Sequence, residues 1–290
     1  MDRLAAFVAI IFDGIAYGSL LFLISVGLSV TMGLMNFVNL AHGAFAMMGG
    51  FLCVELTGRA GVPFLLALPA VFVGVGLAGA ALELLLYRRL YRRNHLDQVL
   101  FTIGFTLMSV AAATRVWGPS QQPVRLPAFL HGQVRVVGLD IGAYRLFLIA
   151  FVVAVTAALG LLVSRTRFGA QLRAAVDNQQ AANGVGVNVG LLFSATFALG
   201  SGLAGLGGAL AIDVLGLDPT FALKYLVYFL VVVVVGGAGS LKGSLVAALL
   251  LGVVDVAGKY YVPQIGSFII YAAMVALLIF FPAGLYGRRV

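Results

Sequence analysis

Charged residues are scarce in this sequence, and that scarcity limits the kind of protein it can encode. Only 10% of the residues are charged while 62% are hydrophobic, and the mean hydropathy is +1.10. A soluble domain carries about 25% charged residues, and a chain this apolar has too few polar groups to cover a surface in water. The composition therefore excludes a soluble globular protein, and also a disordered chain. We predict an integral membrane protein.

Cysteine and clustered histidine are also lacking. Cys53 is the only cysteine, which excludes disulfide frameworks and cysteine metal sites. His42, His95 and His131 fall in three different segments and form no ligand set. The net charge of +8 comes from basic residues scattered between apolar runs, which argues against nucleic-acid binding. We expect no metal, no cofactor and no nucleic-acid partner.

The sequence offers no enzyme chemistry either. Gly74, Gly76 and Gly79 match the nucleotide-binding pattern G-x-G-x-x-G, but they lie inside an apolar run without a strand–turn–helix unit. No His/Asp/Glu grouping provides a nucleophile–base pair, so we expect no catalytic residue. If the chain takes part in ATP-driven transport, ATP must be hydrolysed on a partner subunit.

Apolar runs divide the whole chain into eight or nine predicted membrane spans, since a spanning helix needs about 20 apolar residues. The fold class we predict is all-α, a polytopic transmembrane bundle forming a single domain over residues 1–290, with the second and seventh runs uncertain. The runs are Leu4–Val30, Leu40–Leu56, Val62–Leu86, Val99–Trp117, Leu146–Val163, Leu191–Ile212, Tyr225–Val235, Leu241–Val256 and Ile265–Phe281.

Basic residues in the short loops predict the orientation. The stretch Tyr87–Asp97 holds four arginines, and the segment 164–188 and the C-terminus add more. The longest loop, 118–143, has only Arg125 and Arg135. We expect Tyr87–Asp97, the segment 164–188 and the C-terminus on the cytoplasmic side, and the loop 118–143 on the extracytoplasmic side. With nine spans, this places the N-terminus outside.

Glycine is abundant, with 37 residues, and part of it is explained by close helix packing. Gly200, Ala204 and Gly208 form a small-residue stripe of that kind. The clusters Gly33–Gly50 and Gly236–Gly252 instead interrupt apolar runs in the two halves of the chain. Broken segments in corresponding positions are typical of transporters built from two related halves, with the solute path at their interface.

The run from Asn36 to Gly43 is the most unusual polar cluster of the apolar regions. Asn36, Asn39 and His42 supply donors and acceptors without a fixed charge, which suits a polar or zwitterionic solute. A structural explanation competes, because the asparagines can cap the helix that starts near Leu40 and His42 can bond a backbone carbonyl.

Four acidic residues also lie within the apolar runs. We interpret Glu55, Glu83 and Asp255 as exposed at run ends, and the deeper Asp13 as lining a path or pairing with a neighbouring helix.

The polar segment Thr166–Asn188 is longer than a connector between antiparallel helices requires. Phe168, Leu172, Ala175, Val176 and Gln179 share one helical face. This predicts a short amphipathic helix that stops near Gly184 and Gly186. The alternative is an ordinary interfacial loop.

Three motifs give the chain its resemblance to a known family. They are MGLMNFVNLAHGAFAMMGG at Met32–Gly50, TRFGAQLRAAVDNQQAANGVGVN at Thr166–Asn188 and VVGGAGSLKGSLVAALLLG at Val234–Gly252, and the ending FPAGLYGR also fits. With these motifs the sequence resembles the permease subunits of branched-chain amino-acid ABC importers over essentially its whole length. It departs at Gln180 and Asn183, where the family often has an acidic residue and a leucine.

The resemblance implies a permease in the inner membrane of a bacterium, importing branched-chain or related amino acids by alternating access. Implied partners are a second homologous permease, two ATPase subunits and an extracytoplasmic solute-binding protein. We expect the solute path at Asn36, Asn39, His42, Gly43, Gly236 and Gly237. The resemblance makes 164–188 the ATPase-coupling segment, with Arg173, Ala174, Ala175, Asp177, Asn178, Ala181, Gly184 and Gly186 as its contact residues.

Two other functions stay open on the sequence. Related permeases import urea and short amides. A transporter driven by an ion gradient would need several deep, paired ionisable residues, of which Asp13 is the one clear candidate.

Overall fold

The chain is almost entirely helical, as predicted. The structure, a computed structural model, describes residues 2–35, 37, 39–91, 93–136 and 139–287. Its longer helices are α1 (Asp2–Met35), α2 (His42–Gly58), α3 (Phe64–Leu85), α4 (His95–Trp117), α5 (Ala143–Arg165), α8 (Val189–Leu215), α10 (Leu226–Gly236), α11 (Leu241–Tyr261) and α12 (Gly266–Phe280). The shorter elements are η1 (Tyr87–Arg89), η2 (Ala128–Leu130), α6 (Arg167–Asp177), α7 (Gln179–Gly184), α9 (Phe221–Lys224) and an antiparallel hairpin of β1 (Gln133–Val136) and β2 (Leu139–Gly142).

Among the described residues, six helices are long and apolar enough to cross a membrane. They are α1, α3 continued through η1, α4, α5, α8 and α11, and shorter apolar helices cover Phe221–Gly236 and Gly266–Phe280. The chain is thus an all-helical multi-pass membrane protein. Each of these helices falls on an apolar run predicted from the sequence.

Helix α8 lies at the centre of the bundle and packs against α1, α2 and α3. A Cβ atom on Gly200 would lie 2.9 Å from the carbonyl oxygen of Gly27 in α1, and one on Gly208 would overlap the backbone of Ala46 in α2. These glycines therefore let helix backbones touch, and the close-packing interpretation of the stripe is confirmed.

Helices α1 and α11 form the second close pair. The Oγ atoms of Ser29 and Ser244 are 2.9 Å apart in a buried hydrogen bond. Gly33 lies against Gly239, whose Cβ position would be 2.9 Å from the Gly33 Cα. The two glycine-rich clusters, far apart in the sequence, thus meet at the end of α1.

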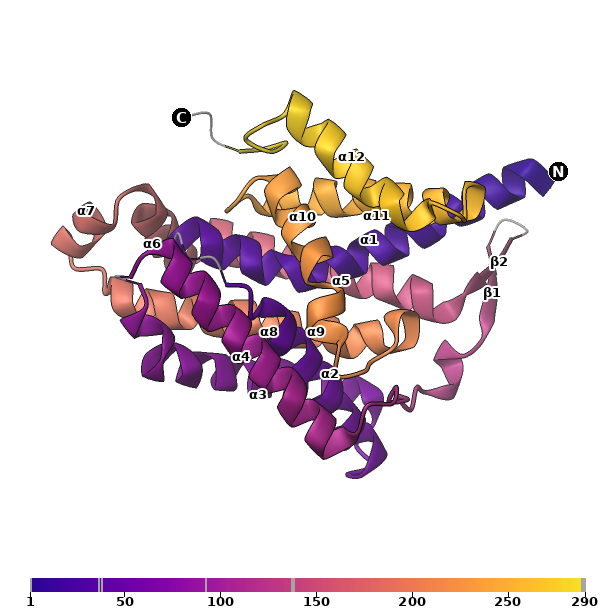
Figure 1. Cartoon of the computed structure of the whole chain (residues 1–290), viewed down its shortest axis with the longest axis horizontal. Coiled ribbons are helices and arrows are strands. Elements are labelled where there is room, and N and C mark those ends of the chain that lie inside the picture. Colours follow the sequence, from indigo (N-terminus) through magenta and orange to yellow (C-terminus); the bar gives the residue numbers. More distant parts are fainter. Residues whose placement is uncertain (1, 36, 38, 92, 137–138, 288–290) are drawn as a thin grey trace.

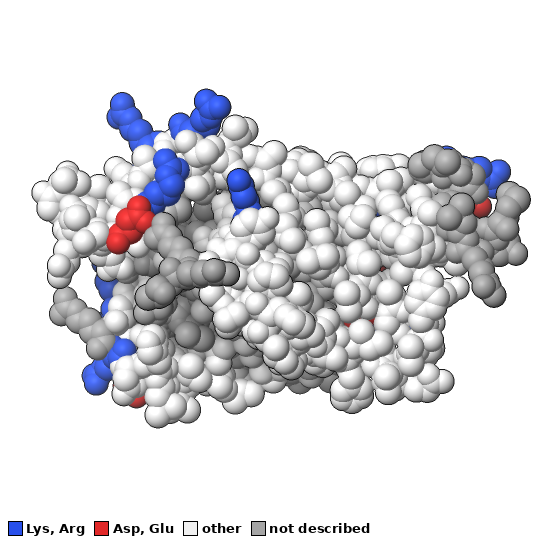
Figure 2. All heavy atoms as spheres, turned by 90° about the horizontal axis from the view of Figure 1, so that it is seen from above, with Lys and Arg blue, Asp and Glu red and all other residues white. Residues whose placement is uncertain are grey.

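The two ends of the bundle differ in character. In Figure 1 the short helices α6 and α7 lie at one end of the long axis, and the N-terminal part of α1 and the β1–β2 hairpin lie at the other. Figure 2 shows Lys and Arg gathered near the α6–α7 end and a middle region almost free of charge on that face. The Arg88 guanidinium reaches Gly190 and Ser194 at the start of α8, so η1 also lies at the α6–α7 end. The segments 87–97 and 164–188 therefore share one end, opposite the hairpin of the loop 118–143.

Candidate functional site

The segment 164–188 folds as two short helices, because three side chains cap helix starts within it. The Thr166 hydroxyl accepts a hydrogen bond from the Gly169 N–H at 3.2 Å and begins α6. Asn178 has an extended backbone (φ −158°, ψ 105°), and its Oδ1 accepts from the Ala181 N–H at 2.9 Å, which ends α6 and begins α7. Asn188 begins α8 in the same way, through the Leu191 N–H. The predicted short amphipathic helix is confirmed as α6, but it does not continue to the stop at Gly184, because the cap at Asn178 ends it and begins a second helix.

The two short helices pack one face onto the bundle and leave the other exposed. Leu172, Ala175 and Ala182 are buried, with exposed fractions of 6%, 1% and 2%. Ala174 and Ala181 are exposed. Ala175 therefore packs within the chain, while Ala174 and Ala181 face outward.

The remaining expected coupling residues lie around this exposed surface. Asn178, Gly184 and Gly186 are exposed, and Gly186 has φ +88°, consistent with the predicted stop. The Arg173 guanidinium donates a hydrogen bond to the Val163 carbonyl at the end of α5. Arg173 and Asp177 both line a cavity of about 640 Å³ beneath α6, formed with the ends of α1 and α5 and the start of α11.

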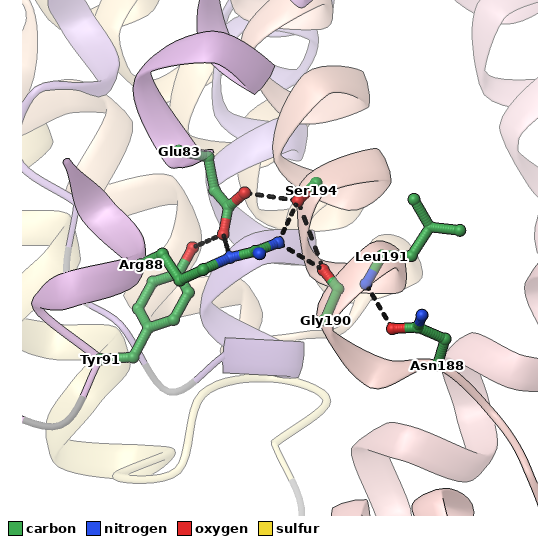
Figure 3. Close-up of polar contacts among 7 residues, drawn as sticks. All are labelled: Glu83, Arg88, Tyr91, Asn188, Gly190, Leu191 and Ser194. Carbon is green, nitrogen blue, oxygen red and sulfur yellow. Dashed lines mark hydrogen bonds and ion pairs between the residues drawn. The ribbon is translucent and has the colours of Figure 1, made fainter. Parts of the chain in front are cut away.

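A buried carboxylate joins α3 to the start of α8, directly after this segment (Figure 3). Glu83 has no exposed surface. Its Oε2 accepts a hydrogen bond from the Ser194 hydroxyl at 2.5 Å, and its Oε1 accepts one from the Tyr91 hydroxyl at 3.0 Å and lies 3.6 Å from the Arg88 Nε. Arg88 also donates to the Ser194 Oγ at 3.0 Å. Burial, and to a smaller extent the charge of Glu83, raises the pKa of the Tyr91 hydroxyl well above its usual range. The hydroxyl therefore stays protonated and donates its hydrogen bond to Glu83.

This network was missed from the sequence, where Glu83 was interpreted as exposed at a run end. That interpretation is wrong, and it is also wrong for Asp255, which is 1% exposed. Glu55 keeps 24% of its side chain exposed and pairs with Arg59 at 3.1 Å. Asp13 forms an ion pair with Arg145 of α5, so it does pair with a neighbouring helix.

The polar cluster before α2 is held by local contacts. Asn36 lies outside the described residues. The Asn39 Oδ1 accepts a hydrogen bond from the Ala41 N–H at 3.1 Å, and the His42 Nε2 lies 2.7 Å from the Ile24 carbonyl oxygen. Both side chains are 2% exposed. The His42 contact matches the carbonyl bonding of the structural alternative. The capping part of that alternative is wrong for Asn39, because the N-cap of α2 is Ala41 without a side-chain cap, and Asn39 instead closes a turn before the helix.

The glycines expected on the path serve two different junctions. Gly43 of α2 lies against Ala222 of α9, so a Cβ there would overlap the Ala222 backbone. Gly236 and Gly237 lie at the far end of α10, where a Cβ on Gly237, which has φ +92°, would lie 2.6 Å from the Gly287 N. The break that packs against the start of α2 is thus the one between α8 and α10, whereas the Gly236–Gly252 cluster meets the end of α1.

A second cavity, of about 520 Å³, lies towards the hairpin end between α1, α5, α11 and α12. Asp13, Arg145, Asp255 and Lys259 line it, together with four tyrosines. Asn39, His42, Gly43, Gly236 and Gly237 line neither of the two cavities. No group of three His, Cys, Asp or Glu side chains able to hold a metal ion occurs among the described residues.

Comparisons with known proteins agree with one another. A family model described as "Branched-chain amino acid transport system / permease component" matches residues 10–278. The chain is 26% identical to the high-affinity branched-chain amino acid transport system permease protein BraD of Pseudomonas aeruginosa, over 95% of this chain and 94% of that protein. It is 24% identical to LivH of Escherichia coli, a permease protein of the same description, over 99% of this chain and 97% of that protein.

The similarity extends to a further relative. A probable branched-chain amino acid transport permease protein LivH of Methanocaldococcus jannaschii is 26% identical over 91% of this chain and 86% of that protein. No solved structure matches the chain.

Proposed function

Since this chain belongs to the branched-chain amino-acid transport permease family, we propose that it forms, with a second related permease, the membrane path of an importer for branched-chain amino acids. The match over residues 10–278, almost the whole chain, carries this conclusion. As a permease component the chain provides the path, and ATP is hydrolysed on separate subunits. The solute then crosses by alternating access, from a binding protein outside to the cytoplasm.

The proposed arrangement has nine crossings and an external N-terminus. The six long helices supply six of them, and α2, the pair α9–α10 and α12 supply three more. His42 at the start of α2 bonds Ile24, eleven residues before the end of α1, so α2 begins about 16 Å inside the bundle. The α9 break packs against the same region, which supports a pair of broken elements, one from each half, meeting at mid-depth.

The proposed coupling surface is the exposed side of α6 and α7. It contains Ala174, Asn178 and Ala181, with Arg173 and Asp177 at its edge, and it lies at the basic end of the molecule. One ATPase subunit would dock on this surface, and a second would dock on the corresponding surface of the partner permease. The Glu83 network holds the start of α8 directly behind this surface, so movement of the segment would be passed to α3 and α8.

The proposed path at Asn36, Asn39, His42 and Gly43 has its own test. Replacing Asn39 and His42 together by alanine is expected to reduce uptake while ATP hydrolysis persists. His42→Gln, which retains a nitrogen donor for the Ile24 carbonyl, is the control. If uptake falls only in proportion to a lowered unfolding temperature, the two side chains are structural.

The proposed function is tested by purifying the complex of this chain and its chromosomal neighbours. We expect leucine-loaded binding protein to stimulate ATP hydrolysis by the complex. Stimulation by urea or acetamide in place of leucine would move the solute class to short amides. ATP hydrolysis that ignores the binding protein, with uptake driven by a proton gradient, would refute the proposed function.

A further inference from the structure

The cavity of about 520 Å³ at the hairpin end differs chemically from the rest of the bundle interior. It carries both signs of charge within apolar surroundings, from Asp13, Asp255, Arg145, Lys224 and Lys259. Its volume is within the range of about 300–1,000 Å³ typical of small-molecule sites. A charge at membrane depth is costly, so such a group calls for a functional explanation.

Asp255 is the residue that the packing alone does not explain. Its side chain is 1% exposed, and its Oδ2 lies 2.5 Å from the Lys259 Nζ. Its Oδ1 is buried and has no hydrogen-bond partner. Buried carboxylate oxygens are rarely left unpaired, because the lost hydration is not replaced. This oxygen is therefore an unpaired acceptor on a residue that lines the cavity.

The cationic side chains of the cavity have more N–H donors than their contacts within the chain use. Arg145 of α5 pairs with Asp13 of α1, and a guanidinium has five N–H donors, more than one carboxylate uses. The Lys224 Nζ lies 5.2 Å from the centre of the Tyr225 ring, and the Lys259 Nζ lies 5.6 Å from that of Tyr17. Donors for a carboxylate thus line the same cavity as Asp255, whose Oδ1 has no partner.

Aromatic rings complete the lining. The ring centres of Tyr225 and Tyr228 are 6.0 Å apart, and those of Tyr228 and Tyr271 are 5.9 Å apart, with neighbouring rings tilted by 59°. Tyr225, just before α10, Tyr228 of α10 and Tyr271 of α12 thus form a row of rings in the lining. The Tyr225 hydroxyl donates to the Leu215 carbonyl at 3.2 Å, which directs its polar end to the backbone of α8. Aromatic rings in a cavity lining accommodate an aliphatic side chain.

We propose that this cavity binds a zwitterionic amino acid with an apolar side chain, as a station in the permease itself. The solute ammonium is bound by Asp255 Oδ1, the carboxylate by Arg145, and the side chain by the tyrosine rings. The proposal rests on the proposed function and adds to it a solute-selective site at the hairpin end. An uncharged amide such as urea would offer no charged partner to Asp255 or to Arg145.

The test uses the complete complex in proteoliposomes, with radiolabelled leucine uptake and two competitors that each lack one charge. The first competitor, 4-methylpentanoate, has no ammonium, and the second, 3-methylbutylamine, has no carboxylate. Asp255→Asn and Arg145→Gln are the variants. The control is Glu55→Gln, which removes the acid of another pair four residues apart on a helix, outside the cavity.

We expect Asp255→Asn to raise the half-saturating leucine concentration about tenfold, equivalent to one charge-assisted hydrogen bond. In this variant leucine should lose its advantage over 4-methylpentanoate but keep it over 3-methylbutylamine. Arg145→Gln should show the reverse pattern, and Glu55→Gln should match the wild type. Co-purification of all subunits checks that each variant assembles.

The outcomes separate the site from the function. If the wild-type complex takes up leucine, and Asp255→Asn, Arg145→Gln and Glu55→Gln all change the half-saturating leucine concentration equally or not at all, the site is overturned. The importer function is not affected by that result. The same loss of preference in both cavity variants overturns the assignment of ammonium to Asp255 and carboxylate to Arg145. Absence of leucine uptake by the wild-type complex overturns the function and this site with it.

Discussion

Glu83 illustrates how a single buried charge organises the end of the bundle. Ser194, Tyr91 and Arg88 come from two distant parts of the chain and all contact this one carboxylate. A charged hydrogen bond contributes about 1.5–3 kcal/mol, and removing one partner leaves the others unsatisfied. The residue therefore fixes the start of α8 against η1.

We predict that Glu83→Gln lowers the stability of the purified chain by about 1–3 kcal/mol, because a neutral amide accepts less strongly and turns an N–H group towards donors. The measurement is thermal unfolding in detergent. Asp140→Asn is the control, since its partner Arg135 is 75% exposed and surface pairs contribute little. Equal unfolding temperatures for the two variants would contradict the role given to Glu83.

Residue roles at membrane depth were only partly predictable from the sequence. Position near a run end suggested exposure for Glu83 and Asp255, yet both are buried. The spacing of four between Asp255 and Lys259 was a signal that was available, since such pairs meet on a helix. No local pattern could pair Asp13 with Arg145, because those two residues meet only through tertiary packing.

At the scale of elements, small residues decide which helices touch. Gly200 of α8 faces Gly27 of α1 with no room for a side chain. By contrast, nothing lies within 4 Å of the Cβ position at Gly104 of α4. Gly200 thus allows two helices of this chain to pack closely, whereas Gly104 has no such role within this chain.

We predict that Gly200→Val destabilises the bundle by about 1–3 kcal/mol or more, because the added volume forces α1 and α8 apart. Gly104→Ala, by comparison, should be neutral or slightly stabilising, since alanine favours helix. Thermal unfolding of both variants in one detergent makes the comparison. A similar loss in both would show that the α1–α8 contact is not close-packed.

The exposed alanines of α6 and α7 give a second prediction at this scale. Ala174→Trp should reduce both the amount of ATPase that co-purifies and its stimulation by loaded binding protein, because packed interfaces tolerate little added volume. Ala157→Trp, at an exposed position of α5, is the matched control. Normal ATPase binding and stimulation in Ala174→Trp would remove this segment as the coupling element.

The elements themselves were well predicted where the apolar runs were long. Leu191–Ile212 and Leu146–Val163 correspond closely to α8 and α5. Irregular segments were predicted less well, because caps and close contacts decide them. Asn178 splits the expected helix, and the α9 break at residues 221–224 is recognised only when Gly43 is seen to pack on Ala222.

At the scale of the whole molecule, the asymmetry of charge predicts the orientation in the membrane. The basic segments 87–97 and 164–188 share the α6–α7 end, and basic loops stay in the cytoplasm. Cys53, the native cysteine, has no exposed surface. The wild type therefore provides a silent background for labelling with a thiol reagent.

We predict that a membrane-impermeant thiol reagent labels Ser120→Cys in intact spheroplasts. Gln171→Cys, exposed on α6, should be labelled only after the membrane is opened. The two variants control for each other, because each reports on one end of the bundle. The reversed pattern would place α6 and α7 outside, away from any cytoplasmic ATPase.

The central claim is that this chain provides the path of an ATP-driven importer of branched-chain amino acids. The most direct measurement is uptake of radiolabelled leucine into proteoliposomes that hold the assembled complex, with ATP on the α6–α7 side and binding protein on the hairpin side. We predict accumulation that requires both ATP and binding protein and that persists when ion gradients are collapsed. Uptake that continues without ATP and stops when the proton gradient is abolished would contradict the account.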